Sequence, residues 1–200
     1  EAGYASPSRN MWTHIGSEGN RHLEGMLFDD VAADWGVSVE EAVCRVMAEE
    51  SLACGFRGTP PLSVRPWRQV EEDVMQLMAR PDYMVGSDSI PVGGMPHPRA
   101  YGCFVRVLGR LRRRYNYPVE QVVQRMTQNP AERFGLTDRG VIAEGMFADL
   151  VVFDAEHVID RSTFEDPAVH PEGVPWVLVN GEFAVENEDV TGVLAGEAIP

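Results

Sequence analysis

The chain has 200 residues, of which 44% are hydrophobic, enough to bury the core of one domain with a small appendage. Its formal net charge of -14 argues against a nucleic-acid partner, because the protein as a whole would repel a polyphosphate. The sequence has no run of about twenty apolar residues that could span a bilayer and no charged-then-apolar start typical of a secretory signal, so we expect a soluble, cytoplasmic protein without a membrane partner.

Cysteine and histidine spacing gives no sign of a metal site within the chain. The three cysteines, Cys44, Cys54 and Cys103, form no CxxC pair, so we expect buried thiols rather than a disulfide framework or a zinc knuckle. His14 and His22 are too far apart for a local chelate, and we interpret them as surface or packing residues. The sequence contains no HxH pair.

Two helices are predicted in the first fifty residues. Apolar residues recur at helical spacing from Leu23 to Ala32, and Gly36 is a suitable C-cap for that helix. Ser38 can cap a second helix, with Glu41 three residues later completing a capping box.

The middle of the chain begins with a segment rich in Gly and Pro, residues 51–64, in which we predict one short strand around Ala53–Phe56. Residues 71–81, EEDVMQLMARP, predict a helix with acidic residues in its first turn and Pro81 just past its end. Tyr83–Val85 then predicts a short apolar strand that ends at Gly86-Ser87-Asp88.

Further helices are predicted between residues 101 and 135. The first, residues 101–115, carries Arg110 and Arg112–Arg114 near its end, which we interpret as complements of the helix dipole and as surface charge. Pro118 suits the first turn of the next helix. Asn129-Pro130 ends that helix and starts a short one that closes at Gly135.

From Gly140 the pattern changes to strands. The segment ADLVVFD predicts a compact buried strand, VPWVLVNG a second and EFAVE a third. Asn180-Gly181 is the typical turn of a tight hairpin between the last two. We therefore predict two domains, residues 1–139 and a small β unit at residues 140–200.

Residues 84–102, MVGSDSIPVGGMPHPRAYG, place Asp88, His97 and Arg99 on a loop after the predicted strand. In a parallel α/β barrel, the end of a strand lies at the face where catalysis takes place. A carboxylate there can take a proton from an attacking water and later return it to a leaving amine. Arg99 offers a planar fork suited to a carboxylate, and His97 can bind, polarise or simply pack.

Seven motifs follow one another between residues 86 and 181: GSDSI, PHPRAYGCF, RVLGRL, MTQNPAERFGL, DRGVIAEGMFADLVVFD, RSTFEDP and VLVNG. In this order they resemble the C-terminal part of the N-acyl-D-amino-acid deacylases, the D-aminoacylase branch of the amidohydrolase superfamily. The resemblance is close from Pro81 to about Gly196 and looser over the preceding helices.

The resemblance implies an α/β fold: the C-terminal part of a metal-dependent (β/α)8 TIM barrel with inserted helices at residues 1–139, and a segment of a small β-sandwich at residues 140–200. It implies a zinc-dependent enzyme that removes the acyl group from N-acyl-D-amino acids. It assigns Asp88 as the proton shuttle and Arg99 as the group that holds the substrate α-carboxylate. Ser87 and His97 are implied as neighbouring substrate-binding residues, although packing of the loop is an equally good interpretation of His97.

The family's zinc ligands include an HxH pair on an earlier strand, and this chain has none. We therefore expect the zinc ligands, and the strands that complete the barrel and the sandwich, to come from a missing N-terminal portion or a second chain. Alone, the chain is expected to be inactive and not to fold natively, because its strand edges would be unpaired. Two other hypotheses stay open: an amidohydrolase acting on dipeptides or cyclic amides such as hydantoins, and a non-catalytic fragment or partner subunit.

Overall fold

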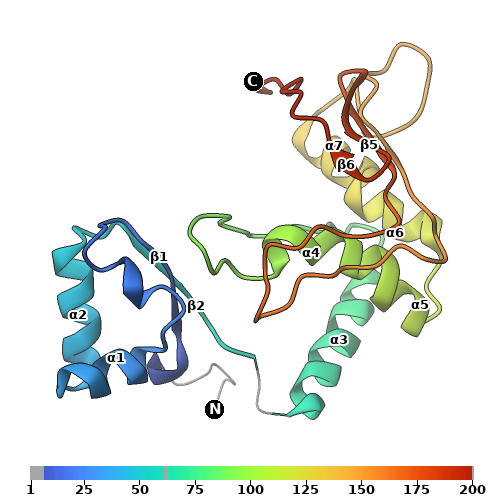
Figure 1. Cartoon of the computed structure of the whole chain (residues 1–200). Helices are drawn as coiled ribbons and strands as arrows, with labels where there is room; N and C mark the ends of the chain where they lie inside the picture. The colour runs from blue at the N-terminus through green and yellow to red at the C-terminus, as the bar shows by residue number, and fades with distance from the viewer. Residues whose placement is uncertain (1–6, 61–62, 200) are drawn as a thin grey trace. The chain divides into compact units, whose positions relative to one another are not determined.

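The computed structural model describes residues 7–60 and 63–199, which divide into two compact units (Figure 1). The first unit comprises the residues up to Trp67 together with Asp88–Tyr101 and Ser162–Val169. The second comprises Arg68–Ser87, Gly102–Arg161 and the residues from His170 onward. Each unit thus combines segments that are distant in sequence. The boundaries between the units lie at positions other than the predicted division between residues 139 and 140.

The first unit contains an antiparallel pair of strands, β1 (Met11–Ile15) and β2 (Cys54–Arg57). The second strand confirms the prediction of a short strand in this Gly-rich region. Between the strands, the chain forms helices α1 (Phe28–Trp35) and α2 (Val39–Glu49), and the short 3-10 turns η1 (Pro7–Arg9) and η2 (Arg21–Leu23) lie nearby in sequence.

Both predicted helix caps are confirmed. Gly36 ends α1 in the left-handed conformation, with φ of 66°. The Ser38 hydroxyl accepts a hydrogen bond from the Glu41 backbone N–H at 3.2 Å and caps α2. However, α1 begins at Phe28 rather than near Leu23, because Gly25 has a φ of 87° that a helix cannot continue through.

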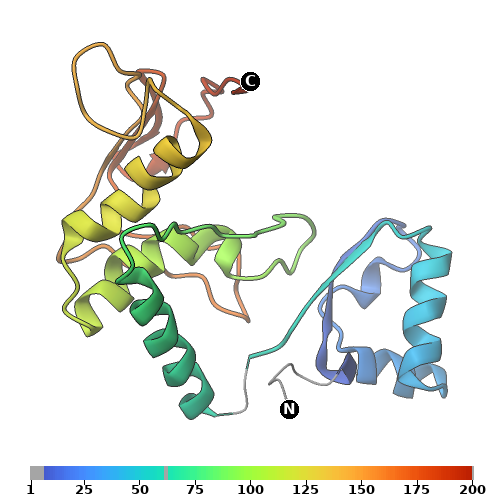
Figure 2. The same ribbon diagram turned by 180° about the vertical axis from the view of Figure 1, so that it is seen from behind.

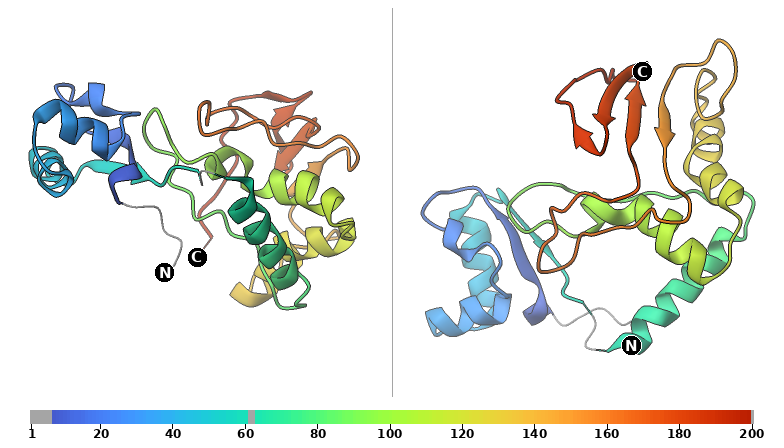
Figure 3. Two further views of the ribbon diagram at one scale, coloured as in Figure 1. Left: turned by 90° about the horizontal axis from the view of Figure 1, so that it is seen from below. Right: turned by 45° about the vertical axis from the view of Figure 1, so that its right-hand side comes forward.

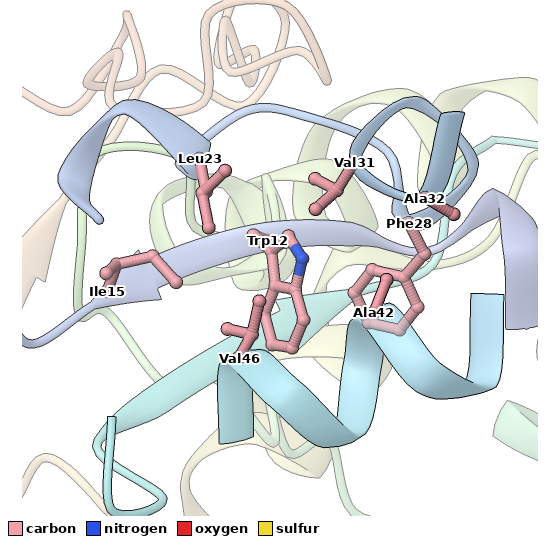
Figure 4. Close-up of a cluster of buried hydrophobic side chains, with 8 residues drawn as sticks. All are labelled: Trp12, Ile15, Leu23, Phe28, Val31, Ala32, Ala42 and Val46. Atoms are coloured by element: carbon pink, nitrogen blue, oxygen red, sulfur yellow. The ribbon is translucent and has the colours of Figure 1, made fainter. Parts of the chain in front are cut away.

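The core of the first unit surrounds Trp12 of β1 (Figure 4). The Trp12 and Phe28 rings lie 4.4 Å apart between centroids. Side chains from β1, α1, α2 and the intervening turn complete the cluster, which consists of Trp12, Ile15, Leu23, Phe28, Val31, Ala32, Ala42 and Val46. Because burial of large apolar side chains is the main stabilising contribution in a small domain, this cluster fixes the position of β1.

The second unit contains several helices connected by loops (Figure 2). Helix α3 (Val64–Met78) leads into it, and α4 (Arg99–Arg106) continues through a π-helical turn, η3 (Val107–Leu111), into α5 (Arg112–Arg114). Helix α6 (Val119–Met126) follows directly after Pro118, which is its N-cap rather than part of its first turn. Helix α7 (Gln128–Phe134) closes at Gly135 as predicted.

The core of the second unit is built by α3, η3 and α6, and includes Val158 from the chain that follows β3. Its buried members are Met75, Met78, Val107, Leu108, Leu111, Val122 and Val158. Gly109 lies so close to this chain that an added Cβ would come within 2.3 Å of the Val158 carbonyl oxygen. The Arg113 guanidinium donates to the same carbonyl at 2.9 Å.

The arginines of this long helix are 41–54% exposed, as predicted for surface charge, but they also pair with buried carboxylates, which the prediction did not include. Arg106 donates to Glu71 at 3.0 Å and to Asp160 at 3.2 Å, and Arg110 lies 2.5 Å from Asp160. Arg114 pairs with Glu71 as well. Both carboxylates are buried, and because they come from α3 and from residues after β3, spacing along the helix does not reveal them.

Helix α3 also differs from its predicted start. The acidic residues expected in the first turn lie in the middle of the helix, because it begins at Val64. One of them, Glu71, is the buried partner of the arginines. Its position therefore serves packing and pairing in the core rather than the helix dipole.

Residues Tyr83–Val85 do not form the predicted strand. In the described part of the chain no strand pairs with them, and two helices contact this segment instead. The Val85 N–H donates to the Arg125 carbonyl of α6 at 3.1 Å, and the Asn129 side chain of α7 donates to the carbonyls of Pro81 and Tyr83.

The second unit also holds a four-stranded antiparallel sheet in the order β3-β4-β5-β6 (Figure 3). Its strands are β3 (Leu150–Val152), β4 (Trp176–Val179), β5 (Glu182–Glu186) and β6 (Asp189–Val190). The hairpin at Asn180-Gly181 is confirmed, with positive φ at both residues.

The prediction that the first of these strands is buried was wrong. Val151 is 56% exposed and Val152 is 46% exposed. The described residues therefore cover only about half of each of these two valines. The expected buried thiols are also only partly found, because Cys44 is exposed on α2 while Cys54 and Cys103 are half-buried. The described helices include none with the length and apolar character needed to cross a membrane.

Candidate functional site

The residues singled out from the sequence lie at the two ends of the loop that precedes α4. Asp88 has a φ of 47°, in the left-handed region that non-glycine residues adopt only occasionally, and its side chain is 91% exposed. Arg99 is the first residue of α4, and its Nη2 lies 3.1 Å from Asp88 Oδ2. Ser87, just before Asp88, is half-buried, and its contact with substrate remains a prediction. The structure therefore joins the predicted proton shuttle and the predicted carboxylate-binding residue in one ion pair.

His97 is held in a defined state beside Arg99. Its Nδ1 accepts a hydrogen bond from the Arg99 backbone N–H at 3.1 Å, so the neutral ring carries its proton on Nε2. Its ring meets the Phe164 ring edge-on at 5.1 Å. Burial, followed by the positive charges of Arg99 and Arg57, lowers the pKa of His97 to about 4. His97 is therefore neutral at pH 7, and its Nδ1 is used to orient the first residue of α4.

The middle of the loop is fixed on strand β1. The Gly94 N–H donates to Glu24 Oε2 at 3.2 Å, and the Met95 N–H donates to the Thr13 carbonyl at 3.4 Å. Gly93 has a φ of 85°, and a Cβ built there would lie 2.0 Å from the Thr13 carbonyl oxygen. Only glycine fits this approach of loop to strand, so the Gly-Gly pair in the sequence marks a docking point and not only flexibility.

Arg57, at the end of β2, holds the same loop from another side and was not predicted as a site residue. Its side chain is buried, with 5% of the residue exposed, and burial lowers its pKa. Its Nε donates to the Met95 carbonyl at 3.1 Å and its Nη2 donates to the Phe164 carbonyl at 2.7 Å. Because these partners are 38 and 107 residues away in sequence, no local motif marks Arg57 as part of the site.

The segment that contains Phe164 packs against the loop at two further points. The Ser162 hydroxyl donates to the Pro98 carbonyl at 2.8 Å. The Arg57 guanidinium lies over the Phe164 ring, 4.9 Å from its centroid, while His97 meets the same ring. The two residues before Arg99 are thus each held by a contact with residues 162–164.

The described residues contain no group of three or more His, Cys, Asp or Glu that could hold a metal ion. His14 Nδ1 lies 3.6 Å from Glu24 Oε1, and His22 Nδ1 lies 3.1 Å from the Gly19 carbonyl. These contacts agree with the interpretation of both histidines as packing or surface residues. The side chains described here do not by themselves make a zinc site.

The arrangement is therefore suited to proton transfer and anion binding. Asp88 presents a solvent-accessible carboxylate that can accept or donate a proton. Arg99 presents a guanidinium that already binds one carboxylate, that of Asp88.

The sequence pattern of the Amidohydrolase family matches residues 22–185, so the chain belongs to this family. The sequence is also similar to D-aminoacylase of Alcaligenes xylosoxydans xylosoxydans, with 37% identity over 178 residues. That alignment covers 88% of this chain and 34% of the relative.

Two solved structures show the same relationship. A crystal structure of D-aminoacylase matches with a TM-score of 0.77 and 34% identity, over 94% of this chain and 37% of the other. N-acyl-D-glutamate deacylase from Bordetella bronchiseptica, complexed with zinc and a phosphonate inhibitor that mimics the reaction's tetrahedral intermediate, matches with a TM-score of 0.73 and 34% identity, over 90% of this chain and 35% of the other. The predicted resemblance is confirmed, and the chain spans about a third of the length of these relatives.

Proposed function

We propose that this chain forms part of an enzyme that hydrolyses the amide bond of N-acyl-D-amino acids. The observation that carries the proposal is the ion pair between Asp88 and Arg99, in a chain that belongs to the amidohydrolase family. In an N-acyl amino acid the scissile amide nitrogen and the carboxylate are attached to the same carbon. A base that acts at the amide and a cation that binds the carboxylate must therefore lie close together, as these two residues do.

Asp88 is the proposed general base and general acid. As a carboxylate it takes a proton from the attacking water, whose oxygen forms a bond to the acyl carbon. The carbon–nitrogen bond then breaks, and the Asp88 carboxylic acid returns the proton to the departing amine. The products are the free acid of the acyl group and the D-amino acid, and Asp88 ends the cycle as a carboxylate.

Arg99 is the proposed binding group for the substrate α-carboxylate. Its Nη2 is engaged by Asp88 in the structure, so the incoming carboxylate takes over an interaction that Arg99 already makes. Ser87 and the loop-packing residue His97 are the proposed neighbours of this contact. The backbone hydrogen bond from Arg99 to His97 supports the orienting role of His97.

The proposal extends to zinc and to the rest of the enzyme. Zinc is supported by the related N-acyl-D-glutamate deacylase, whose structure contains it, and its ligands are proposed to come from outside this chain.

Residues 1–139 are proposed as the C-terminal part of a (β/α)8 barrel with inserted helices, and residues 140–200 as a β-sandwich segment. The exposed apolar side chains of β3 support the proposal that an N-terminal portion or a second chain completes the fold and covers them. The cytoplasmic location remains a prediction.

The test is a substrate profile of the complete enzyme, in which this chain is joined to the portion that completes it. We expect release of free amino acid from N-acetyl-D-amino acids, with little release from the L-enantiomers. Dipeptides and a hydantoin serve as the competing substrate classes. Turnover of a hydantoin or dipeptide but not of any N-acyl-D-amino acid would contradict the proposal.

A further inference from the structure

We propose that Arg57 is a positioning residue for the Arg99 loop, defined here as residues 88–99, and that it acts on substrate binding through Arg99. The inference rests on the proposed role of Arg99 as the carboxylate-binding group. Arg57 lies at the end of β2 and contacts the loop at Met95, four residues before Arg99.

A short series of contacts connects Arg57 to Arg99. The Arg57 Nε holds the Met95 carbonyl at 3.1 Å, two residues before His97. The Arg57 guanidinium also lies over the Phe164 ring, and the imidazole of His97 contacts the same ring edge-on. His97 Nδ1 in turn accepts the backbone N–H of Arg99. One side chain thus fixes both the backbone and the ring that set the first residue of α4.

The buried guanidinium of Arg57 is not what a residue with only a packing role would need. Its Nη1 is buried and has no acceptor among the described residues, and no described carboxylate forms an ion pair with it. Burying a guanidinium with an unsatisfied N–H is unfavourable, whereas an apolar side chain of similar length would pack there without this cost. The two hydrogen bonds that Arg57 donates to the loop and to Phe164 are what an apolar residue cannot supply.

Loss of these hydrogen bonds should affect substrate binding more than the chemical step. The Met95 and His97 end of the loop leads into Arg99, whereas Asp88 is at the far end and follows a backbone that α6 and α7 hold. In the complete enzyme we therefore expect Arg57→Met to raise KM for an N-acetyl-D-amino acid about tenfold and to change kcat by less than about threefold.

The experiment compares Arg57→Met and Arg57→Lys with Arg45→Met, which removes an exposed guanidinium of α2 that pairs with Glu49. Each variant is assayed with an N-acetyl-D-amino acid and with the same compound as its α-carboxamide. The carboxamide lacks the charge that Arg99 binds. Because Arg57 acts through Arg99, the rise in KM should be seen with the acid and not with the carboxamide, and it should be absent in Arg45→Met.

A double variant, Arg57→Met with Arg99→Met, provides the second readout. If Arg57 works only by positioning Arg99, adding Arg57→Met to Arg99→Met should raise KM for the acid no further. An unchanged KM in a folded Arg57→Met, or an equal rise with acid and carboxamide, would overturn the inference. If Arg57→Met does not fold, as judged by near-UV circular dichroism, the same comparison with Arg57→Lys decides. If the parent enzyme itself has no deacylase activity, the proposed function is wrong. If the parent is active but Arg57→Met has the KM of the parent, only the role proposed for Arg57 is wrong.

Discussion

Asp88 and Arg99 stand at the two ends of one loop, and their side chains meet in an ion pair of 3.1 Å between Nη2 and Oδ2. The loop between them is fixed by contacts to β1, β2 and residues 162–164. This arrangement lets a short piece of chain present a proton-transferring group and an anion-binding group at a defined separation. A substrate that carries an amide and a carboxylate on one carbon fits such a pair.

Arg99→Lys should raise KM for N-acyl-D-amino acids by about ten- to a hundredfold in the complete enzyme, with a smaller effect on kcat. Lysine keeps the charge but loses the planar fork that binds a carboxylate through two parallel hydrogen bonds. Steady-state kinetics of the variant provides the measurement. A KM equal to that of the parent enzyme would remove Arg99 from the substrate site.

Gly93→Ala should destabilise the protein and loosen the Arg99 loop. The new Cβ would lie 2.0 Å from the Thr13 carbonyl oxygen, and φ at this position is 85°, so either the loop or β1 must move. Overpacking of this kind costs about 1–3 kcal/mol in unfolding free energy. Thermal unfolding of Gly93→Ala is compared with that of Gly19→Ala, whose Cβ meets nothing within 4 Å. Similar midpoints for the two variants would show that the loop does not depend on this contact.

Asp160→Ala should destabilise the second unit. It removes a buried carboxylate that Arg106 and Arg110 both bind, and because the two guanidinium groups are 41% exposed, we expect a loss of about 1–3 kcal/mol, below the cost of breaking a fully buried pair. Denaturant unfolding measures the loss. Asp82→Ala, which breaks an exposed pair with Arg80, is the matched control and should change stability little. Equal unfolding midpoints for the two variants would show that pairing with Asp160 does not stabilise the second unit.

The pKa of His97, lowered to about 4 mainly by burial, predicts a loss of stability in mild acid. Between about pH 6.5 and pH 4 the unfolded chain binds a proton at this imidazole while the folded chain does not, so stability falls as the pH falls through this range. Above about pH 6.5 the ring is neutral in both states and contributes no pH dependence. His97→Asn keeps an acceptor for the Arg99 N–H but cannot be protonated. Its unfolding midpoint should drop less between pH 7 and pH 5 than that of the parent, and an equal drop would contradict the prediction.

Local features of the fold could be predicted from the sequence because their causes are local. The Ser38 cap, the left-handed Gly36 and the Asn180-Gly181 hairpin each depend on the conformational preferences of one or two residues. The ordered motifs from GSDSI to VLVNG likewise identified the family and pointed to the Asp88 and Arg99 that the structure brings together.

Features that depend on distant partners could not be predicted in this way. The ion pairs of the arginines in the α4 to α5 helix were missed because Glu71 and Asp160 lie far away in sequence. Tyr83–Val85 and β3 were predicted as a barrel strand and a buried strand because apolar runs are typical of both, but strand pairing and burial need neighbours that the described residues do not supply. Arg57 was missed for the same reason, since all its partners are remote.

Replacement of Asp88 by Asn tests the central claim most directly, because it keeps the shape of the side chain and removes its capacity to carry a proton. In the complete enzyme, kcat for an N-acetyl-D-amino acid should fall by about two to four orders of magnitude, the usual contribution of a general acid–base residue. A kcat within about threefold of the parent value would show that Asp88 does not transfer the proton, and the catalytic role proposed for this chain would be wrong.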